Sequence, residues 1–462
     1  MTLEDEIARL RAENAELCSA VAQLQEQLAA ALARIAELEH QRREQPSFVK
    51  PNTAPRSDPK PPRKKREKHH NQARRREVPT RILNHALDHC PDCHYQLRGT
   101  SLDYTRQVIE LPPPPPIEVI EHRVIKRWCP ACARWRRPQL DLTGQVLGRG
   151  RIGVRLASLL AYLRTTLRMP IAAIQRYLAS LHQLRLSAGG IQEILHDVRQ
   201  ATRPALDEVK QQARRSRILH GDETSWRQAG QNGYVWSFST PGDDAIRYYE
   251  YDRSRAQAVV KRILGGQFHG HLVSDFYCGY NAYAGKKQRC WAHLLRDLYA
   301  LKQAEQQDAA VVAWAQAVRA CYDTAQAWLA ADAQAPPPAR EAQYVRLTSQ
   351  THALGKQYAR SKQHPCQALA KRLLRHEDEL FQFVLVEGLS ADNNLAERAI
   401  RPLVVIRKVS GGSRSGAGTQ TRLALASLFH TWQARGQNPF ATCLKLLSQS
   451  TASPVQSLLP QL

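Results

Sequence analysis

The first forty residues follow a seven-residue repeat of apolar positions. Leucine dominates one position of the repeat, while β-branched residues and one polar residue, Asn14, occupy most of the alternate position. No Gly or Pro interrupts the pattern, and a buried amide at one level is best satisfied by its counterpart in a second chain. We therefore predict a leucine-zipper coiled coil over residues 1–40 that makes a homodimer; a single amphipathic helix packed on its own domain is the alternative. The repeat comprises Leu3, Ile7, Leu10, Asn14, Leu17, Val21, Leu24, Leu28, Ala31, Ile35 and Leu38.

Helical periodicity returns over residues 150–215. Amphipathic segments are separated by Pro170 and by a Ser-Ala-Gly-Gly turn that ends at Gly190, and the last segment is expected to run as one long helix over 191–215. Helices joined by such a turn resemble a helix-turn-helix that reads a major groove, although any small helical bundle gives the same pattern. We predict a helical DNA-binding region here and keep mere packing as the alternative.

Residues 216–299 show short apolar strands instead of helices. One expected strand leads to Asp222 and another, over 271–275, delivers Asp275 at its carboxyl end. Further strands are expected over 233–240 and 245–251, and a helix near 255–264.

Residues 300–390 are rich in Ala, Gln, Leu and Arg, as expected of helices, and a third acidic candidate follows them. In the next helix Asp392 suits the N-cap and Glu397 lies one turn before Arg401. Two helices should close the chain up to residue 447, followed by a frayed tail over 448–462.

Two CPxC turns lie in the segment 80–145, between the zipper and the helices. Each turn lets two thiolates converge on one ion, and zinc prefers four such ligands in a closed tetrahedral site. We predict a zinc-ribbon domain with strands over 103–110 and 117–126; a redox CxxC is the alternative. The ligands are Cys90, Cys93, Cys129 and Cys132, with His85, His89 or His94 as possible replacements for a cysteine.

The net charge points to a polyanionic partner. The 462 residues carry 66 Lys and Arg against 42 Asp and Glu, a formal charge of +24. Nine of the seventeen residues over 60–76 are basic, so the segment 41–79 reads as a flexible linker that binds phosphates through counterion release, or as a solvated tail that touches nothing. The linker residues chosen as contacts are Lys64, Lys65, Arg66, Arg74, Arg75 and Arg76.

Composition also excludes other classes of protein. With 43% apolar residues and no apolar run of about 18 residues, a membrane protein is not expected. The acidic, helical start lacks a secretory pattern, and ten cysteines are too sparse for a disulfide scaffold. We expect a cytoplasmic, nucleoid-associated protein without membrane contact.

Three converging carboxylates would suit two Mg²⁺ ions that promote in-line displacement at a phosphodiester. The candidates are Asp222, Asp275 and Glu397, although a chain with 42 acidic residues also produces such triplets by accident. Basic residues near Glu397 are candidate phosphate clamps, or they simply balance its charge: Arg398, Arg401, Arg407, Lys408 and Arg414. Cys290 and His293 have CxxH spacing, which could indicate a metal site, but residues three positions apart on a helix more often support the core.

Several motifs together resemble the transposases of the insertion sequence 66 family, members of the DDE class. They are HGDETSW, VSDFYCGY, CWAHLLRDL and DNNLAERAIRPLVVIRK. The resemblance implies a multidomain α/β protein: coiled coil, zinc ribbon, helical DNA-binding region, and a ribonuclease-H-like core (216–299 and 391–447) interrupted by a helical insertion at 300–390. It implies that Asp222, Asp275 and Glu397 form the catalytic triad.

The resemblance further implies the reaction. The expected protein binds the terminal inverted repeats of double-stranded DNA, cleaves the ends with two catalytic Mg²⁺ ions and joins them to target DNA, with possible accessory transposition proteins. A catalytically inactive dimeric DNA-binding regulator and a plain metal-dependent nuclease are the alternatives.

Overall fold

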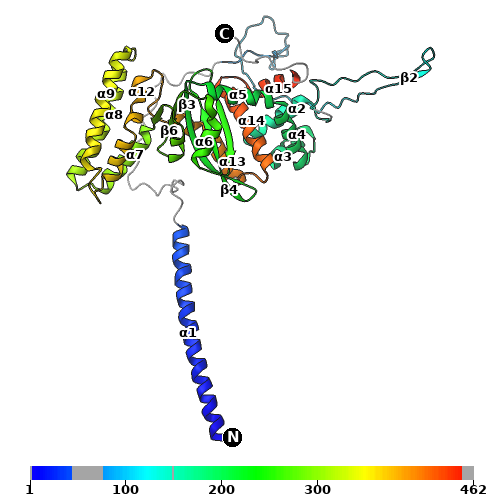
Figure 1. The fold of residues 1–462 in the computed structure, drawn as a ribbon. Coiled ribbons are helices and arrows are strands. Elements are labelled where there is room, and N and C mark those ends of the chain that lie inside the picture. Colours follow the sequence, from blue (N-terminus) through cyan, green and yellow to red (C-terminus); the bar gives the residue numbers. More distant parts are fainter. Residues whose placement is uncertain (1–2, 44–75, 148–149, 450–462) are drawn as a thin grey trace. The chain divides into compact units, whose positions relative to one another are not determined.

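The computed structural model describes residues 3–43, 76–147 and 150–449, shown as coloured ribbon in Figure 1. By its internal contacts the chain divides into two units, Met1–Leu111 and Pro112–Leu462.

In the first unit, α1 (Leu3–Arg43) is an uninterrupted helix over the predicted heptads. The described seam side chains from Leu17 to Ile35 are between 52% and 66% exposed where they are leucine, valine or isoleucine. One copy of the chain therefore leaves this apolar seam uncovered, and its pairing with a second helix stays a prediction.

Residues 76–111 contain a tight turn and otherwise extended chain. The backbone of Cys90 donates to Tyr95 and accepts from His94, both at 2.9 Å, and His89 forms an isolated bridge with Gln96. The strand predicted over 103–110 is wrong, because the structure assigns none there. Its apolar side chains remain exposed, as Val108 is at 80%, so no partner surface favours a sheet.

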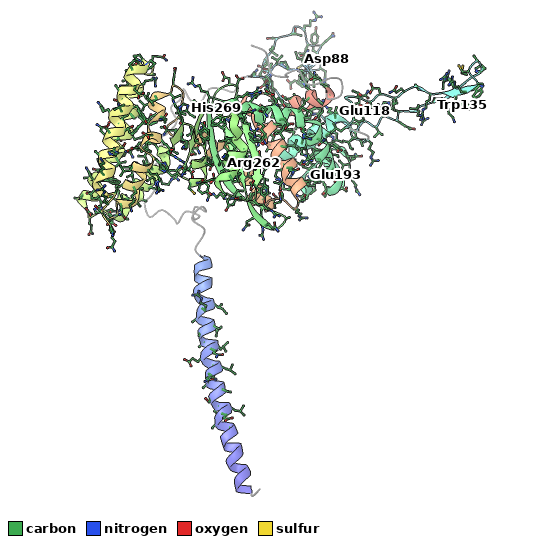
Figure 2. The ribbon with its side chains drawn as sticks, viewed as in Figure 1. Asp88, Glu118, Trp135, Glu193, Arg262 and His269 are labelled. Carbon is green, nitrogen blue, oxygen red and sulfur yellow. The ribbon has the colours of Figure 1, made fainter. Side chains whose placement is uncertain are left out.

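In the second unit, the predicted strand over 117–126 is also absent, and a short hairpin follows it instead. Strands β1 (Arg127–Cys129) and β2 (Arg134–Arg136) pair antiparallel. Trp128 lies opposite Trp135, with 5.9 Å between ring centroids; Trp135 is labelled in Figure 2. Such a cross-strand aromatic pair stabilises a hairpin.

Residues 154–215 form four helices. The prediction of one long helix over 191–215 is wrong, because the helix is interrupted at Thr202. Pro204, in the first turn of the second helix, has no N–H with which to continue the hydrogen bonds of the first helix. The helices are α2 (Val154–Thr165), α3 (Ile171–His182), α4 (Ala188–Ala201) and α5 (Arg203–Arg215).

A five-stranded mixed sheet follows, in the order β5-β4-β3-β6-β7. Strands β3, β4 and β5 are antiparallel neighbours, whereas β6 and β7 run parallel to β3. The strands are β3 (Ile218–Gln228), β4 (Gln231–Ser239), β5 (Arg247–Asp252), β6 (His271–Ser274) and β7 (Lys287–Arg289). Between β5 and β7 lie α6 (Gln257–Leu264) and the short helices η2 (Gly265–Gln267) and η3 (Cys278–Ala282).

The insertion after β7 is helical, as predicted. It has its own apolar core, built around Trp314 and Leu347 and continuous with Trp291 at the sheet. The helices are α7 (Trp291–Ala304), α8 (Ala309–Ala331), α9 (Pro337–Tyr358), α10 (Gln367–Arg375), α11 (Glu377–Leu380) and α12 (Gln382–Leu385).

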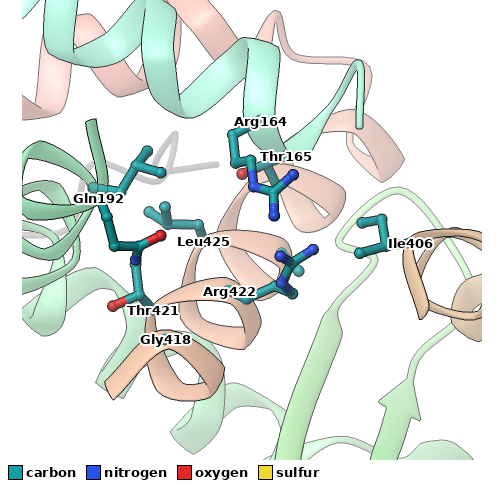
Figure 3. Close-up of a pocket in the computed structure, with 10 residues that line it drawn as sticks. Arg164, Thr165, Gln192, Ile406, Gly418, Thr421, Arg422 and Leu425 are labelled. Atoms are coloured by element: carbon teal, nitrogen blue, oxygen red, sulfur yellow. The ribbon is translucent and has the colours of Figure 1, made fainter. Parts of the chain in front are cut away.

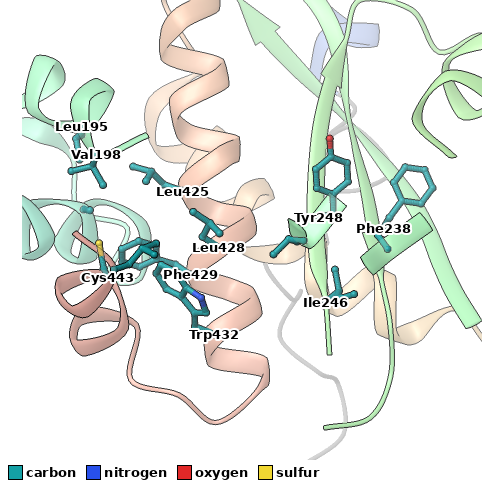
Figure 4. Close-up of a cluster of buried hydrophobic side chains, with 14 of the residues drawn as sticks. Leu195, Val198, Phe238, Ile246, Tyr248, Leu425, Leu428, Phe429, Trp432 and Cys443 are labelled. Carbon is teal, nitrogen blue, oxygen red and sulfur yellow. The ribbon is translucent and has the colours of Figure 1, made fainter. Parts of the chain in front are cut away.

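The chain then returns to the sheet through α13 (Asn394–Ser410), α14 (Gly416–Ala434) and α15 (Pro439–Gln449). Helix α14 is buried along most of its length: Leu425, Leu428 and Phe429 pack between the helices α2–α5 and the sheet (Figure 4). It joins the four-helix region and the sheet in one core. No helix among the described residues is long and apolar enough to span a bilayer.

Candidate active site

Asp222 lies within β3, not at its end as predicted. Side chains alternate between the two faces of a strand, so Asp222 shares a face with His220, Thr224 and Trp226. Trp226 packs against Leu403 and Ile406 of α13 in one apolar cluster. Asp222 therefore points to the face of the sheet that α13 covers.

Asn393 fixes the start of α13 against β3. Its side-chain amide donates to the carbonyl of Gly221 at 2.7 Å, and its amide oxygen lies 3.2 Å from His220 Nδ1. Its backbone N–H donates to the buried thiol of Cys290 at 3.1 Å. Asn393 thus contacts Gly221, 172 residues away in the sequence, and Cys290, 103 residues away. Cys290 therefore helps to hold the start of α13 in place.

Asn393, not Asp392, is the residue that precedes the first turn of α13, so the N-cap prediction is wrong by one position. Asp392 instead accepts a hydrogen bond from the Asn394 N–H at 3.0 Å. A short polar side chain before a helix can satisfy a first-turn amide from either position.

Asp275 directly follows β6, as predicted. The parallel register pairs His220 with Val273, so two residues further along Asp275 is level with Asp222 on the neighbouring strand. The Asp275 side chain accepts from the Tyr277 N–H at 2.9 Å, and its carbonyl accepts from fully buried Arg289 at 2.8 Å. The carboxylate position is thus fixed from both sides of the β6 terminus.

Glu397 occupies the first turn of α13, as predicted. Its carboxylate lies 3.8 Å from Nε2 of His293 on α7, and the buried Nδ1 of His293 has no hydrogen-bond partner among the described residues. His293 therefore faces the candidate site and is a contact that the CxxH spacing did not indicate.

The structure brings the charges of the three predicted carboxylates together. Burial first, and repulsion from Glu223, Asp275 and Glu397 second, raise the pKa of Asp222 to about 8. Three neighbouring carboxylates disfavour the anionic form of Asp222, and the protein alone does not supply enough positive charge nearby to offset their repulsion. This environment is typical of a cation site.

Glu223 is a site residue that sequence reasoning missed. Its side chain is only 2% exposed and forms an ion pair with Arg255 at 2.5 Å. Tyr280 donates a hydrogen bond to the same carboxylate. Glu223 thus points to the opposite face of β3 from Asp222 and is paired with Arg255, although burial still raises its pKa. An acidic residue next to Asp222 was the only signal in the sequence.

The predicted phosphate clamps divide into two groups. Arg407 donates to Thr224 and to the backbone carbonyl of Ser225, so its guanidinium supports β3. The others are exposed on α13 or after it: Arg398, Arg401, Lys408 and Arg414. Of the linker contacts, Arg76 hydrogen-bonds to Thr105, and the rest lie outside the described residues: Lys64, Lys65, Arg66, Arg74 and Arg75.

One cysteine of each CPxC turn has a lowered pKa. Backbone amides of Cys93 and Asp92 lower the pKa of Cys90, and the Cys93 side chain contributes. Hydrogen bonds from Arg136 and Cys129 lower the pKa of Cys132. The surroundings of Cys90 and Cys132 therefore favour the thiolate, the form of cysteine that binds a metal.

No group of three or more His, Cys, Asp or Glu side chains in residues 3–43, 76–147 and 150–449 is arranged to hold a metal ion as it stands. The donor chemistry nevertheless fits two different metals. Carboxylate oxygens at Asp222, Asp275 and Glu397 suit a hard cation, and paired cysteine turns suit zinc.

Comparison with known families decides the identity of the core. Residues 149–421, from the start of the four-helix region into α14, match the model described as "Transposase IS66 family". The chain belongs to this family. The resemblance seen in the sequence motifs is thereby confirmed, and the matched range includes all three candidate carboxylates.

Residues 88–133 match the model of the zinc-finger binding domain of transposase IS66. This range begins before Cys90 and ends after Cys132, so it supports structural zinc at the two cysteine turns.

A curated relative is similar to a large part of the chain. It is the uncharacterized protein y4qI of Sinorhizobium fredii (strain NBRC 101917 / NGR234), 25% identical over 285 residues. The match covers 55% of this chain and 52% of the relative, so the chain spans about half the length of that protein.

Proposed function

We propose that this chain is a DNA transposase that cleaves element ends and joins them to target DNA by Mg²⁺-dependent phosphoryl transfer. Membership in the transposase IS66 family supports DNA transposition. The observation that carries the catalytic assignment is the placement of the three carboxylates: the parallel register puts Asp275 level with Asp222, and Glu397 lies in the first turn of α13, the helix that Asn393 holds to β3. The raised pKa of Asp222, caused by burial and by the neighbouring carboxylates, agrees with this placement.

We infer that the sheet with its helices is a ribonuclease-H-like core with a helical insertion between Asp275 and Glu397. Support comes from three antiparallel strands followed by two strands parallel to the first. In this arrangement Asp222 is on the first strand, Asp275 follows the fourth, and Glu397 arrives on the covering helix α13.

Asp222, Asp275 and Glu397 would hold the catalytic cations. Mg²⁺ held by these carboxylates would supply activation of the attacking oxygen and stabilisation of the leaving oxygen of the phosphodiester. In cleavage, water would form a bond to phosphorus while the bond to the 3′ oxygen breaks. In transfer, the freed 3′-hydroxyl would form a bond to a target phosphorus while the bond from that phosphorus to the 3′ oxygen of the target strand breaks. The chain's own residues keep the carboxylates in place: Asn393 holds α13 to β3, and Arg289 holds the end of β6.

The other parts of the chain would bind zinc, bind DNA and form the dimer. Zinc at Cys90, Cys93, Cys129 and Cys132 would stabilise the segment that contains the two turns, and the basic residues would bind DNA phosphates. The exposed seam of α1 would form a parallel homodimer.

The decisive experiment is a strand-transfer assay with full-length protein, labelled element ends and Mg²⁺. Asp222→Asn, Asp275→Asn and Glu397→Gln should each lower the rate by at least about 10³-fold while DNA binding persists. Asp243→Asn is the matched control, because Asp243 is exposed in the β4–β5 turn. Wild-type activity in the triad variants would disprove the assignment. Binding without cleavage by the wild type indicates the inactive regulator, and cleavage without joined products indicates a nuclease.

A further inference from the structure

A small pocket lies where the four-helix region meets α13 and α14 (Figure 3). Its wall is mixed, with apolar side chains at Leu195, Ile406 and Leu425 and hydroxyl or amide groups at Thr421 and Gln192. None of its ten lining residues is acidic; the complete lining is Arg164, Thr165, Gln192, Leu195, Ile406, Gly418, Thr421, Arg422, Leu425 and Ala426.

Two guanidinium groups enter this pocket from opposite walls, Arg164 from α2 and Arg422 from α14 (Figure 3). Arg164 donates to the Met169 carbonyl at 2.7 Å, and Arg422 lies 5.9 Å from the Trp226 ring centroid. Neither of these contacts supplies a negative charge.

The electrostatics agree with this geometry. Burial, with a smaller contribution from the charge of Arg164, lowers the pKa of Arg422 to about 9, and burial also lowers the pKa of Arg164. Two partly desolvated cations that repel one another gain free energy when an anion enters between them. Arginine binds phosphate and carboxylate oxygens strongly through charge-assisted, often bidentate hydrogen bonds, and phosphate is the anionic group of DNA.

We propose that the pocket of Arg164 and Arg422 binds a phosphate group of the DNA backbone and thereby sets how the duplex lies relative to the catalytic carboxylates. The assignment rests on the proposed function for the identity of the ligand as DNA. It adds two specific residues, from α2 and α14, that the basic linker and the exposed face of α13 do not include.

The position of the pocket along α13 suits this role. Glu397 is in the first turn of the helix, and Ile406 lines the pocket nine residues later. At 1.5 Å per residue this separation is about 14 Å along the helix, or roughly four base pairs of duplex. A phosphate in the pocket and a scissile phosphate at Glu397 can therefore belong to the same DNA segment.

The test is the salt dependence of DNA binding by the full-length protein, without Mg²⁺, with a fluorescent element-end duplex as the probe. Arg422→Met keeps a long apolar side chain next to Trp226 but removes the charge. We expect affinity to fall about tenfold and the slope of log Kd against log salt to fall by about 0.9, the value of one phosphate contact. Arg164→Met should give a similar change. If both arginines bind the same phosphate, the double variant should lower the slope by less than the sum of the two single changes.

Two variants control for folding and for net charge. Arg422→Lys should recover most of the slope, and Arg346→Met removes an exposed charge on α9 and should leave it unchanged. Thermal unfolding of each variant reports stability separately.

An unchanged slope in Arg422→Met overturns the proposal. The proposal is also overturned if Arg422→Lys loses as much affinity as Arg422→Met and both variants have a lowered Tm, because that result identifies a packing role for Arg422. If inorganic phosphate raises the wild-type Tm but the DNA slope does not depend on Arg422, the pocket binds free phosphate and the DNA assignment is wrong. Because binding is measured without catalysis, Glu397→Gln should keep the full slope, and failure of the catalytic proposal would leave this result interpretable.

Discussion

The sheet with α13 and the two cysteine turns present their functional side chains by opposite means. Around Asp222, hydrogen bonds join positions more than 100 residues apart, as Asn393 does with Gly221 and Cys290. The backbone hydrogen bonds at the Cys90 turn and the pairs of the β1–β2 hairpin join residues at most nine positions apart, and apolar side chains such as Val108 and Val119 are exposed.

The comparison teaches where the stabilising free energy must come from. A site on a packed sheet is fixed by burial and can hold carboxylates that repel one another. A segment with little buried surface depends on metal ligation, because zinc binding supplies the free energy that a core does not.

The largest expected effect comes from removing zinc. Structural zinc contributes about 10–16 kcal/mol of binding free energy in small domains, so Cys90→Ser should abolish stoichiometric zinc and make residues 76–147 sensitive to protease. The transition of the core should move by less than about 2 °C, since the two regions are stabilised separately. Metal analysis and limited proteolysis measure both effects.

Cys18→Ser is the control, because Cys18 is an exposed thiol on α1 outside the two turns. Stoichiometric zinc in Cys90→Ser, or loss of the core transition with the metal, would remove the distinction between the two regions.

A smaller effect is expected within the core at Arg289. This fully buried guanidinium pairs with Glu379 at 2.6 Å and donates to the Asp275 carbonyl. Arg289→Met leaves these acceptors without their partner and should lower the free energy of unfolding by about 3 kcal/mol in urea titrations.

Arg319→Met removes an exposed ion pair with Asp323 and should cost less than about 0.5 kcal/mol. Equal stability of both variants would contradict the claim that burial makes the core contacts strong.

The smallest expected effect is an increase in the free energy of unfolding, because the buried Asp222 carboxylate destabilises the core. The pKa of Asp222 is raised from 3.8 to about 8, so between these values the folded protein keeps a proton that the unfolded chain has released. The free energy of unfolding therefore falls as pH rises through this window.

Asp222→Asn removes this loss, and we expect the zinc-loaded variant without Mg²⁺ to exceed the wild type by about 1–3 kcal/mol at pH 8.5 and by much less at pH 5. Thermal unfolding at both pH values measures it, with Asp243→Asn as the flat control. A difference independent of pH would show that the carboxylate is not desolvated as described.

The strands that carry Asp222 and Asp275 were predictable because short apolar runs are local patterns, although β3 continues past Asp222 to Gln228. The position of Asn393 was not, since its partners Gly221 and Cys290 are remote in sequence. The strands expected over 103–110 and 117–126 failed for the same reason: strand propensity without a partner surface does not make a sheet. The break at Thr202 was visible in principle, because Pro204 cannot extend a helix.

Glu397 follows the whole α7–α12 insertion in the chain, whereas both aspartates precede it. Under the proposed function, a chain still on the ribosome carries both aspartates long before the glutamate that completes their site. Synthesis itself would then leave the site without its third carboxylate until the polypeptide has passed residue 397.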